Sequence, residues 1–279
     1  MTALVALASA LLIGSADFAG GLAARRDSPL RVTLWTQLTS FATAVALVGL
    51  VAAPAVTRTD LVAGAVAGLS GAFSFVAFYG ALGRGVMGVV APTTAVVGAS
   101  VPALIGVARG EHLSLPTSVG LVVAVVAIVL VTRSGDQQAS GASTPPVALV
   151  LAVVAGLGFS IFFVALGETS GDAGLWPLVV ARVVSVPLVA VTARVATGRV
   201  GLAPEARGPA LGAGVIEMLA NVLLLYALRW GPLAVASVFG SLYPVSTVLL
   251  ARRFLHERLA PTQVAGVGVA TLALALVAL

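Results

Sequence analysis

The second half of this chain repeats the first half at a fixed spacing of 146 residues. The matching positions in the first half are Leu82, Gly85, Val89, Leu104, Glu111, Leu113, Gly120, Ala124, Ala127, Leu130 and Val131. Without a gap, they recur as Leu228, Gly231, Val235, Leu250, Glu257, Leu259, Gly266, Ala270, Ala273, Leu276 and Val277. A duplicated apolar chain is typical of transporters that consist of two structural repeats with the binding site between them. The repeat therefore favours a transporter before any single side chain is considered.

The composition requires that lipid surrounds most of the chain. Hydrophobic residues make up 59% of the 279 residues, charged residues make up 9%, and the mean hydropathy is +1.12. A soluble domain is about one quarter charged, so this chain cannot cover a surface that faces water. The net charge of +5 comes from arginines scattered in short loops, without a basic stripe, which excludes nucleic acid as a partner. The lack of cysteine excludes disulfides and cysteine-based metal sites.

The N-terminal run, residues 2–16, has two interpretations. Ala8-Ser9-Ala10 resembles the cleavage site of a signal peptide. However, no positive segment precedes the run, and it stays apolar through Leu22. We therefore expect a retained first membrane helix.

Ten apolar runs approach the length of about 20 residues that a membrane helix needs. They cover residues 3–23, 30–52, 61–82, 86–108, 115–132, 146–167, 174–196, 208–228, 232–252 and 261–279. A polar linker, residues 133–145, joins a first five-helix repeat (1–132) to a second one (146–279). Because five is odd, the second repeat enters the membrane from the opposite side. We therefore expect an all-α integral membrane protein with ten transmembrane helices in two inverted five-helix repeats (5+5).

The arginines divide unevenly between the two membrane faces of this topology. Eleven lie on the face of the first, third, fifth, seventh and ninth loops, and three lie on the other face. The positive-inside rule then predicts that the arginine-rich face is cytoplasmic and that both termini lie outside. The expected location is the plasma (inner) membrane.

Two expected helices, residues 115–132 and 261–279, contain no ionisable side chain. We expect them to form a lipid-facing scaffold, with the solute pathway among the other eight helices. Matched small-residue pairs, Gly64 with Gly68 and Gly208 with Gly212, predict close helix packing in the two halves.

A charge inside a membrane span costs about 2.5–3.5 kcal/mol at a helix centre, and three ionisable residues stand out well inside the expected spans. They are Asp17, Arg182 and Glu217, and Glu217 lies four residues before Asn221, on the same helical face. A buried carboxylate can bind and release a proton near neutral pH, as a proton-coupled exporter requires. It can also bind a cationic substrate in competition with the proton.

The alternative is that Asp17 or Glu217 forms a structural ion pair with Arg182. The proton hypothesis predicts that Asp17→Asn or Glu217→Gln abolishes transport without loss of expression or fold. Full transport by both variants would contradict that hypothesis.

Further polar and aromatic residues are candidates for lining a pathway. They are Gln37 in the second helix, Tyr79 in the third, Asn221 in the eighth and Tyr243 in the ninth. Tyrosine can alternatively anchor a helix at the membrane surface. Three prolines, Pro92, Pro102 and Pro244, are expected to interrupt the fourth and ninth helices.

Glu111 and Glu257 end the fourth and ninth helices at matched positions of the repeats, and Gly120 and Gly266 follow nine residues later. Both glutamates lie at loop depth. We expect a structural role for this motif, with each glutamate capping a loop or a helix entry.

These two segments carry a family resemblance. The sequences Gly106-Val107-Ala108-Arg109-Gly110-Glu111-His112-Leu113 and Arg253-Phe254-Leu255-His256-Glu257-Arg258-Leu259 resemble the two repeats of the EamA branch of the drug/metabolite transporter (DMT) superfamily. The resemblance covers the whole chain and includes Tyr226-Ala227-Leu228, Gly231 and Pro244. It implies ten helices, a central cavity between two inverted repeats, and export or exchange of small metabolites.

The chain departs from the family pattern at several positions. Ile13-Gly14 stands where relatives often have Trp-Gly, and the arginine common in the second helix is absent, although Arg182 matches its counterpart in the seventh. Relatives usually have both termini in the cytoplasm, in conflict with the arginine distribution. Asp17 is similar in placement to the proton-coupling carboxylate of the distantly related small multidrug exporters.

These patterns favour a secondary transporter that exports a small metabolite by alternating access, with protons as the candidate coupling ion. A small multidrug or cation exporter and a non-transporting regulatory membrane protein are the alternatives. An enzyme is not expected, because the chain lacks Gly-x-Ser-x-Gly, His-Glu-x-x-His and a Walker motif. We expect no cofactor or metal, a small-molecule substrate and the lipid bilayer as partners, and a monomer or homodimer. Amino acids, nucleosides, sugars and organic cations all remain open as substrates.

Overall fold

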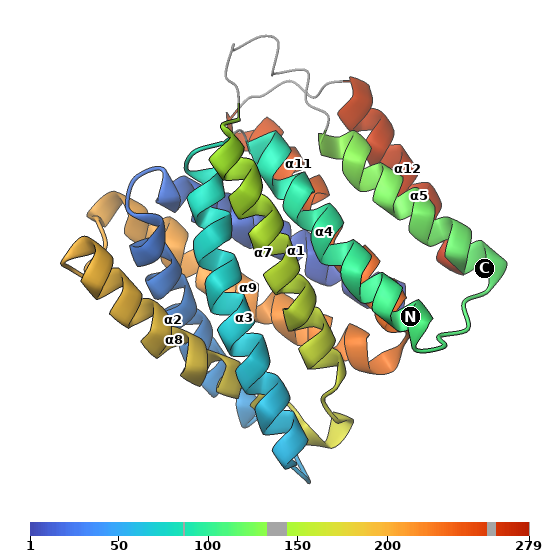
Figure 1. The fold of residues 1–279 in the computed structure, drawn as a ribbon, viewed down its shortest axis with the longest axis horizontal. Coiled ribbons are helices and arrows are strands. Elements are labelled where there is room, and N and C mark those ends of the chain that lie inside the picture. The colour runs from blue at the N-terminus through green and yellow to red at the C-terminus, as the bar shows by residue number, and fades with distance from the viewer. Residues whose placement is uncertain (86, 133–143, 256–260, 279) are drawn as a thin grey trace.

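The computed structural model describes residues 1–85, 87–132, 144–255 and 261–278, and these are helical throughout apart from their connections (Figure 1). The first half has α1 (Thr2–Ala24), α2 (Pro29–Val48), α3 (Arg58–Leu82), α4 (Met87–Ala108) and α5 (Leu115–Thr132). The second has α7 (Pro146–Gly167), a short 3-10 helix (Gly171–Ala173), α8 (Trp176–Thr197), α9 (Pro204–Trp230), α10 (Leu233–Gly240), α11 (Tyr243–Leu255) and α12 (Pro261–Ala278). The all-α class is confirmed, whereas most of the expected linker lies outside the described residues.

Several helix ends follow directly from local sequence. Proline occupies the first helical position of α2, α7 and α9, where its missing N–H costs no hydrogen bond. The α3 helix begins with a capping box, in which the Thr57 side chain accepts from the Asp60 N–H and the Asp60 carboxylate accepts from the Thr57 N–H. The α8 helix ends at Gly198, whose φ of 70° is left-handed and therefore favours glycine.

The expected ninth helix is broken, whereas the expected fourth helix is not. A turn at Ser241 and Leu242 separates α10 from α11, directly before the Tyr243-Pro244 pair. The prediction of an interruption near Pro244 is therefore confirmed. The prediction for Pro92 and Pro102 is wrong, because α4 runs continuously through both positions.

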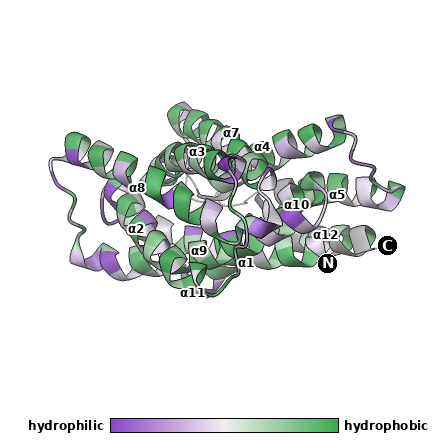
Figure 2. Cartoon of the chain, turned by 90° about the horizontal axis from the view of Figure 1, so that it is seen from below, coloured by the Kyte–Doolittle hydropathy of each residue, from purple (hydrophilic) through white to green (hydrophobic). Residues whose placement is uncertain are grey.

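Five helices of the described chain are long and apolar enough to cross a membrane: α1, α3, α7, α8 and α9. Shorter apolar stretches lie in α4, α5 and the α10–α11 segment. In the view of Figure 2, hydrophobic residues make up most of the helices, and many of the hydrophilic residues lie at helix ends and connections. Multiple membrane-spanning helices are therefore supported.

The helix contacts have a two-fold pattern. The α1 helix packs on α9 as α3 packs on α7, and α2 packs on α9 as α3 packs on α8. The α4 helix packs on α7 as α10 and α11 pack on α1. Each of these interfaces joins the two halves of the chain. The two halves are therefore packed against each other through pairs of equivalent interfaces, in which each helix of one half has the contacts of its counterpart in the other half.

The α5 and α12 helices pair with each other at one edge of the molecule (Figure 1). Few other helices contact them, and each is the last helix of its half of the chain. This position agrees with the expected scaffold role.

Glycine allows two helix crossings at matched positions. A Cβ on Gly68 of α3 would lie 2.7 Å from the Ala181 Cα of α8, and one on Gly214 of α9 would lie 2.8 Å from the Thr39 Cβ of α2. Gly68 and Gly214 are 146 residues apart. The expectation of close packing holds for Gly64 and Gly68 but is wrong for the second pair, because a Cβ at Gly208 or Gly212 would meet only open space.

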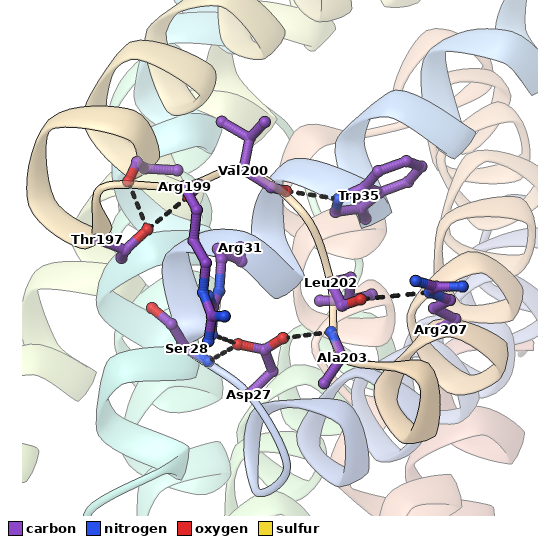
Figure 3. Close-up of polar contacts among 11 residues, drawn as sticks. Asp27, Ser28, Arg31, Trp35, Thr197, Arg199, Val200, Leu202, Ala203 and Arg207 are labelled. Carbon is purple, nitrogen blue, oxygen red and sulfur yellow. Dashed lines mark hydrogen bonds and ion pairs between the residues drawn. The ribbon is translucent and has the colours of Figure 1, made fainter.

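The loops on one end of the bundle are tied together by Asp27, between α1 and α2 (Figure 3). Its carboxylate pairs with Arg31 and accepts a 2.7 Å hydrogen bond from the Ala203 N–H, before α9. The Trp35 indole donates to the Val200 carbonyl of the same second-half loop. The α1–α2 and α8–α9 loops therefore lie on one end.

The opposite end carries a second set of contacts between loops. The Ser170 N–H, after α7, donates to the Asp60 carboxylate at the start of α3 over 2.6 Å. The Glu111 carboxylate, after α4, accepts hydrogen bonds from the Leu233 N–H at 2.6 Å and the Ala234 N–H at 3.1 Å. Loops thus alternate between the two ends, as successive crossings of the bundle require.

Candidate functional site

A buried cavity lies between the two halves, where six helices and the helix break converge. Its lining comes from α1, α3 and α4 of the first half and from α7, α9, the turn at Ser241 and α11 of the second half. The lining residues are Ile13, Asp17, Phe75, Thr94, Ala95, Gly98, Phe159, Phe162, Phe163, Glu217, Asn221, Leu224, Ser241 and Tyr243. Neither α5 nor α12 contributes, which agrees with their scaffold position.

Residues of the cavity wall occur in pairs separated by the repeat spacing. Four such pairs line it: Ile13 with Phe159, Asp17 with Phe163, Phe75 with Asn221, and Ala95 with Ser241. The cavity therefore lies where equivalent surfaces of the two halves face each other. The chemistry of the pairs differs, because three of them place a polar side chain opposite an apolar one.

Asp17 is the unpaired charge of this cavity. Its residue is 5% exposed, and no hydrogen bond or ion pair reaches its carboxylate from the described residues. One turn earlier, Gly14 allows α1 to approach α11, since a Cβ there would lie 2.9 Å from the Thr247 Oγ1. Close packing thus holds Asp17 at the cavity wall without giving it a partner.

Glu217, by contrast, is held by a buried network. Arg182 of α8 forms an ion pair with its carboxylate, and the Asn221 amide donates to the same Oε1 atom over 2.6 Å. The Arg182 Nε also donates to the Ser40 hydroxyl of α2 over 2.9 Å. Within the described chain, Glu217 Oε2 has no partner. Of the two carboxylates considered as partners for Arg182, the structure selects Glu217.

The remaining expected pathway residues divide between the cavity and its surroundings. Tyr243 lines the cavity and donates to the Ala91 carbonyl over 3.2 Å. Gln37 is fully buried outside the cavity, where it accepts from the Ser185 hydroxyl. Tyr79 is buried against α1, since a Cβ on Gly20 would lie 2.7 Å from its Cζ. Asp17, Glu217, Asn221 and Tyr243 are thus brought together.

Sequence reasoning missed the aromatic wall and Ser241. The rings of Phe75 and Phe159 meet edge to face with centroids 5.1 Å apart, and Phe162 and Phe163 line the cavity beside them. The signal was present in the repeat: a shift of 146 residues converts Asp17 into Phe163 and Asn221 into Phe75. Ser241 is 1% exposed and its hydroxyl has no partner among the described residues.

The described residues of the repeat motif lie at a helix end and inside helices, away from the cavity. Glu111 caps the N-terminus of α10, a helix of the other half, through the two hydrogen bonds given above. Gly120 and Gly266 are buried in α5 and α12. Glu257 lies outside the described residues. No group of three potential metal ligands occurs in the described part of the chain.

Comparison with known proteins agrees with this architecture. Residues 144–279 match the sequence model of the EamA-like transporter family. A solved structure titled "Crystal structure of protein" is similar to this chain with a TM-score of 0.76, covering 100% of this chain and 98% of its own, at 14% sequence identity. That likeness concerns the fold alone. No curated protein matches this chain.

The long apolar helices of the described chain define the class as a multi-helix membrane protein. The family match confirms the resemblance seen in the sequence over the second half of the chain, because residues 144–279 match the EamA-like transporter family.

Proposed function

We propose that this chain is a proton-coupled secondary transporter that exports a small metabolite across the plasma membrane by alternating access. Its ten helices form two inverted five-helix repeats, with α10 and α11 together as the ninth. One observation carries the proposal: Asp17 is a buried carboxylate without a partner among the described residues, in a cavity formed by equivalent surfaces of the two halves.

The two-fold contact pattern supports alternating access. Interfaces of the same kind occur on both sides of the cavity, such as α1 with α11 and α7 with α4. Two repeats related in this way can exchange conformations, so that the cavity opens first to one side and then to the other. The loop contacts of Asp27 at one end and Asp60 at the other are the candidates for closing each side.

In this proposal the two cavity carboxylates have different roles. Asp17 carries the proton, because it has no positive partner and must lose its charge or find a cation when the cavity closes. Glu217 is already neutralised by Arg182, so it positions Asn221 and the cavity wall. In this proposal, proton binding and release therefore occur at Asp17.

The test is solute-driven proton movement in proteoliposomes that contain a pH-sensitive dye. Amino acids, nucleosides, sugars and organic amines are each added to wild type, Asp17→Asn and Asp172→Asn. Asp172 is an exposed loop carboxylate and serves as the matched control. We expect at least one solute class to move protons with wild type and Asp172→Asn but not with Asp17→Asn. If no class moves protons with folded wild type, the proposal of proton coupling is wrong.

The inverted topology has a separate test that uses the lack of cysteine. Gly49, Gly171 and Gly201 are exposed, and a side chain at each would meet only open space. Single cysteines there should react with an impermeant thiol reagent from one side for Gly49→Cys and Gly171→Cys, and from the other side for Gly201→Cys. Labelling of Gly201→Cys from the cytoplasm would place the arginine-rich face inside. Labelling of all three from one side would contradict the 5+5 arrangement.

A further inference from the structure

We infer that the transported solute is a small organic cation, a protonated amine that carries an apolar or aromatic group. This inference rests on the proposed transport function and names the substrate class of the same cavity. It follows from the balance of charge, the aromatic wall and the helix break.

The charge balance of the cavity favours a cation. Asp17 contributes one carboxylate that has no partner in the described part of the chain, while the charge of Glu217 is balanced by Arg182. Among the described side chains no arginine lines the cavity, and Arg182 lies 1% exposed behind Glu217. The ionisable groups that face Asp17 from neighbouring helices of the described chain are Tyr79, Glu217 and Tyr243, and none of them adds positive charge. An ammonium group therefore supplies the missing counter-charge.

The aromatic wall suits the rest of such a molecule. Phe75, Phe159, Phe162 and Phe163 surround the cavity with Tyr243, and the Phe75 and Phe159 rings meet edge to face. Aromatic faces attract cations and bury apolar groups, and both effects strengthen where water is excluded. A ligand with a compact ammonium group and an apolar body fits both features.

The helix break adds acceptors for the ammonium hydrogens. The Ser241 hydroxyl is buried without a partner among the described residues, and Ser241 follows directly after the last residue of α10. The C-terminal end of α10 therefore meets the cavity, and helix C-termini favour positive charge. Glu217 Oε2 is a further buried oxygen without a partner in the described chain. An ammonium group carries three N–H donors and can satisfy such oxygens.

The same arrangement disfavours amino acids and other zwitterions. Their carboxylate would enter a cavity that has no basic side chain in its wall and already contains the Asp17 carboxylate. A neutral alcohol of the same shape would leave Asp17 without a counter-charge. Discrimination should therefore follow the charge of the ligand when its shape is held constant.

Binding of the amine exchanges a proton on the protein for a cation. Protonated Asp17 loses its proton to water when the ammonium group arrives, and the carboxylate and the ammonium form the ion pair. When the cation leaves, the carboxylate takes up a proton again. Cation and proton thus compete for one group, which gives antiport without a second ionisable site.

Three ligands of nearly equal shape test this inference on the purified protein: 2-phenylethylamine, L-phenylalanine and 2-phenylethanol. Binding is measured by calorimetry, with proton release recorded in weak buffer. We expect the amine to bind tightest and to release protons, and Asp17→Asn to weaken it about tenfold or more. Asp172→Asn should bind as wild type does, and the melting temperature of Asp17→Asn should show that it is folded.

Several outcomes would overturn the inference. These are equal or tighter binding of L-phenylalanine, equal binding of 2-phenylethanol, or unchanged amine binding by Asp17→Asn. If sugars, nucleosides or amino acids drive Asp17-dependent proton movement in proteoliposomes and amines do not, the transport proposal survives and the substrate class is wrong. If no solute moves protons but the amine binds through Asp17, the binding class survives and proton coupling is wrong.

Discussion

Asp17 and Phe163 are 146 residues apart and line the same cavity from equivalent positions in the two halves. The two halves contribute similar walls to the cavity, but at this position only the wall of the first half has a carboxylate. The cavity therefore combines a symmetric shape with asymmetric charge. Because of this asymmetry, Asp17 can bind the charged group of the solute while the opposite wall, with Phe163, binds its apolar part.

Because positions 17 and 163 are equivalent, we predict that a carboxylate at position 163 can partly replace the one at position 17. We expect Asp17→Asn to lose amine binding and the double variant Asp17→Asn/Phe163→Asp to recover part of it, because both positions face the same space. Calorimetry with 2-phenylethylamine measures the recovery. If the folded double variant binds no better than Asp17→Asn, the two positions are not equivalent for a ligand.

The pair of Arg182 and Glu217 predicts an interdependent effect on stability. Loss of one member of a buried pair costs about 3–5 kcal/mol, because the other charge is left without a partner. We expect Arg182→Gln and Glu217→Gln each to lower the melting temperature in detergent, and the double variant to be more stable than either. This changes the expectation from sequence that Glu217→Gln leaves the fold intact. Additive losses in the double variant would exclude a direct pair.

Much of this fold was predictable because the repeat and the apolar runs both reflect the lipid environment. The bounds of α1 and α7 lie within a residue of the expected helices at 3–23 and 146–167. Rotation of the helices about their axes was not predictable, because helices that are apolar on all sides have no amphipathic stripe that marks the buried face. The sequence therefore could not decide whether Arg182 pairs with Asp17 or with Glu217.

The same limit explains the error at Gly208 and Gly212. Their spacing is that of a packing motif, but spacing alone does not tell which side of α9 contacts α2. The repeat spacing does, because Gly68 maps onto Gly214. Comparison of the halves was thus a better guide to contacts than motifs within one helix.

Gly68 and Gly214 predict matched sensitivity to a single methyl group. Gly68→Ala and Gly214→Ala should each destabilise the protein by about 1–3 kcal/mol, the usual cost of overpacking. Gly212→Ala is the matched control, because its Cβ would meet open space and alanine favours the helix. Thermal unfolding in detergent separates the three. Equal stability of all three variants would contradict the close α3–α8 and α9–α2 crossings.

Loss of the Glu111 carboxylate, in the first half, is predicted to destabilise α10, in the second half. Its carboxylate caps α10, so Glu111→Ala should cost about 0.5–2 kcal/mol, as the loss of a helix cap does. The control is Glu168→Ala, which removes an exposed ion pair with Arg109, worth about 0–1 kcal/mol. Hydrogen exchange should increase at the first turn of α10 in Glu111→Ala only. Unchanged exchange at Leu233 and Ala234 would show that the cap is not formed.

Asp27 predicts a dependence of stability on pH. Partial burial raises the pKa of its carboxyl, but hydrogen bonds from the Ala203 and Ser28 N–H groups and from Arg31 outweigh this and lower the pKa below its ordinary value. A lowered pKa stabilises the folded state above the pKa of the unfolded chain, about 3.9. That stabilisation is lost as the pH falls through the folded pKa.

Asp27→Asn should therefore be less stable than wild type at neutral pH, by about 1–3 kcal/mol for hydrogen bonds to a charged group. The difference should shrink as the pH falls below about 4, where the unfolded chain takes up a proton, and should vanish once the pH is below the lowered pKa of the folded carboxylate. Melting temperatures in detergent across this range measure the difference. Asp172→Asn, in an exposed loop, should match wild type at each pH. A constant difference between Asp27→Asn and wild type at all pH values would mean that the carboxylate charge does not hold the two loops together.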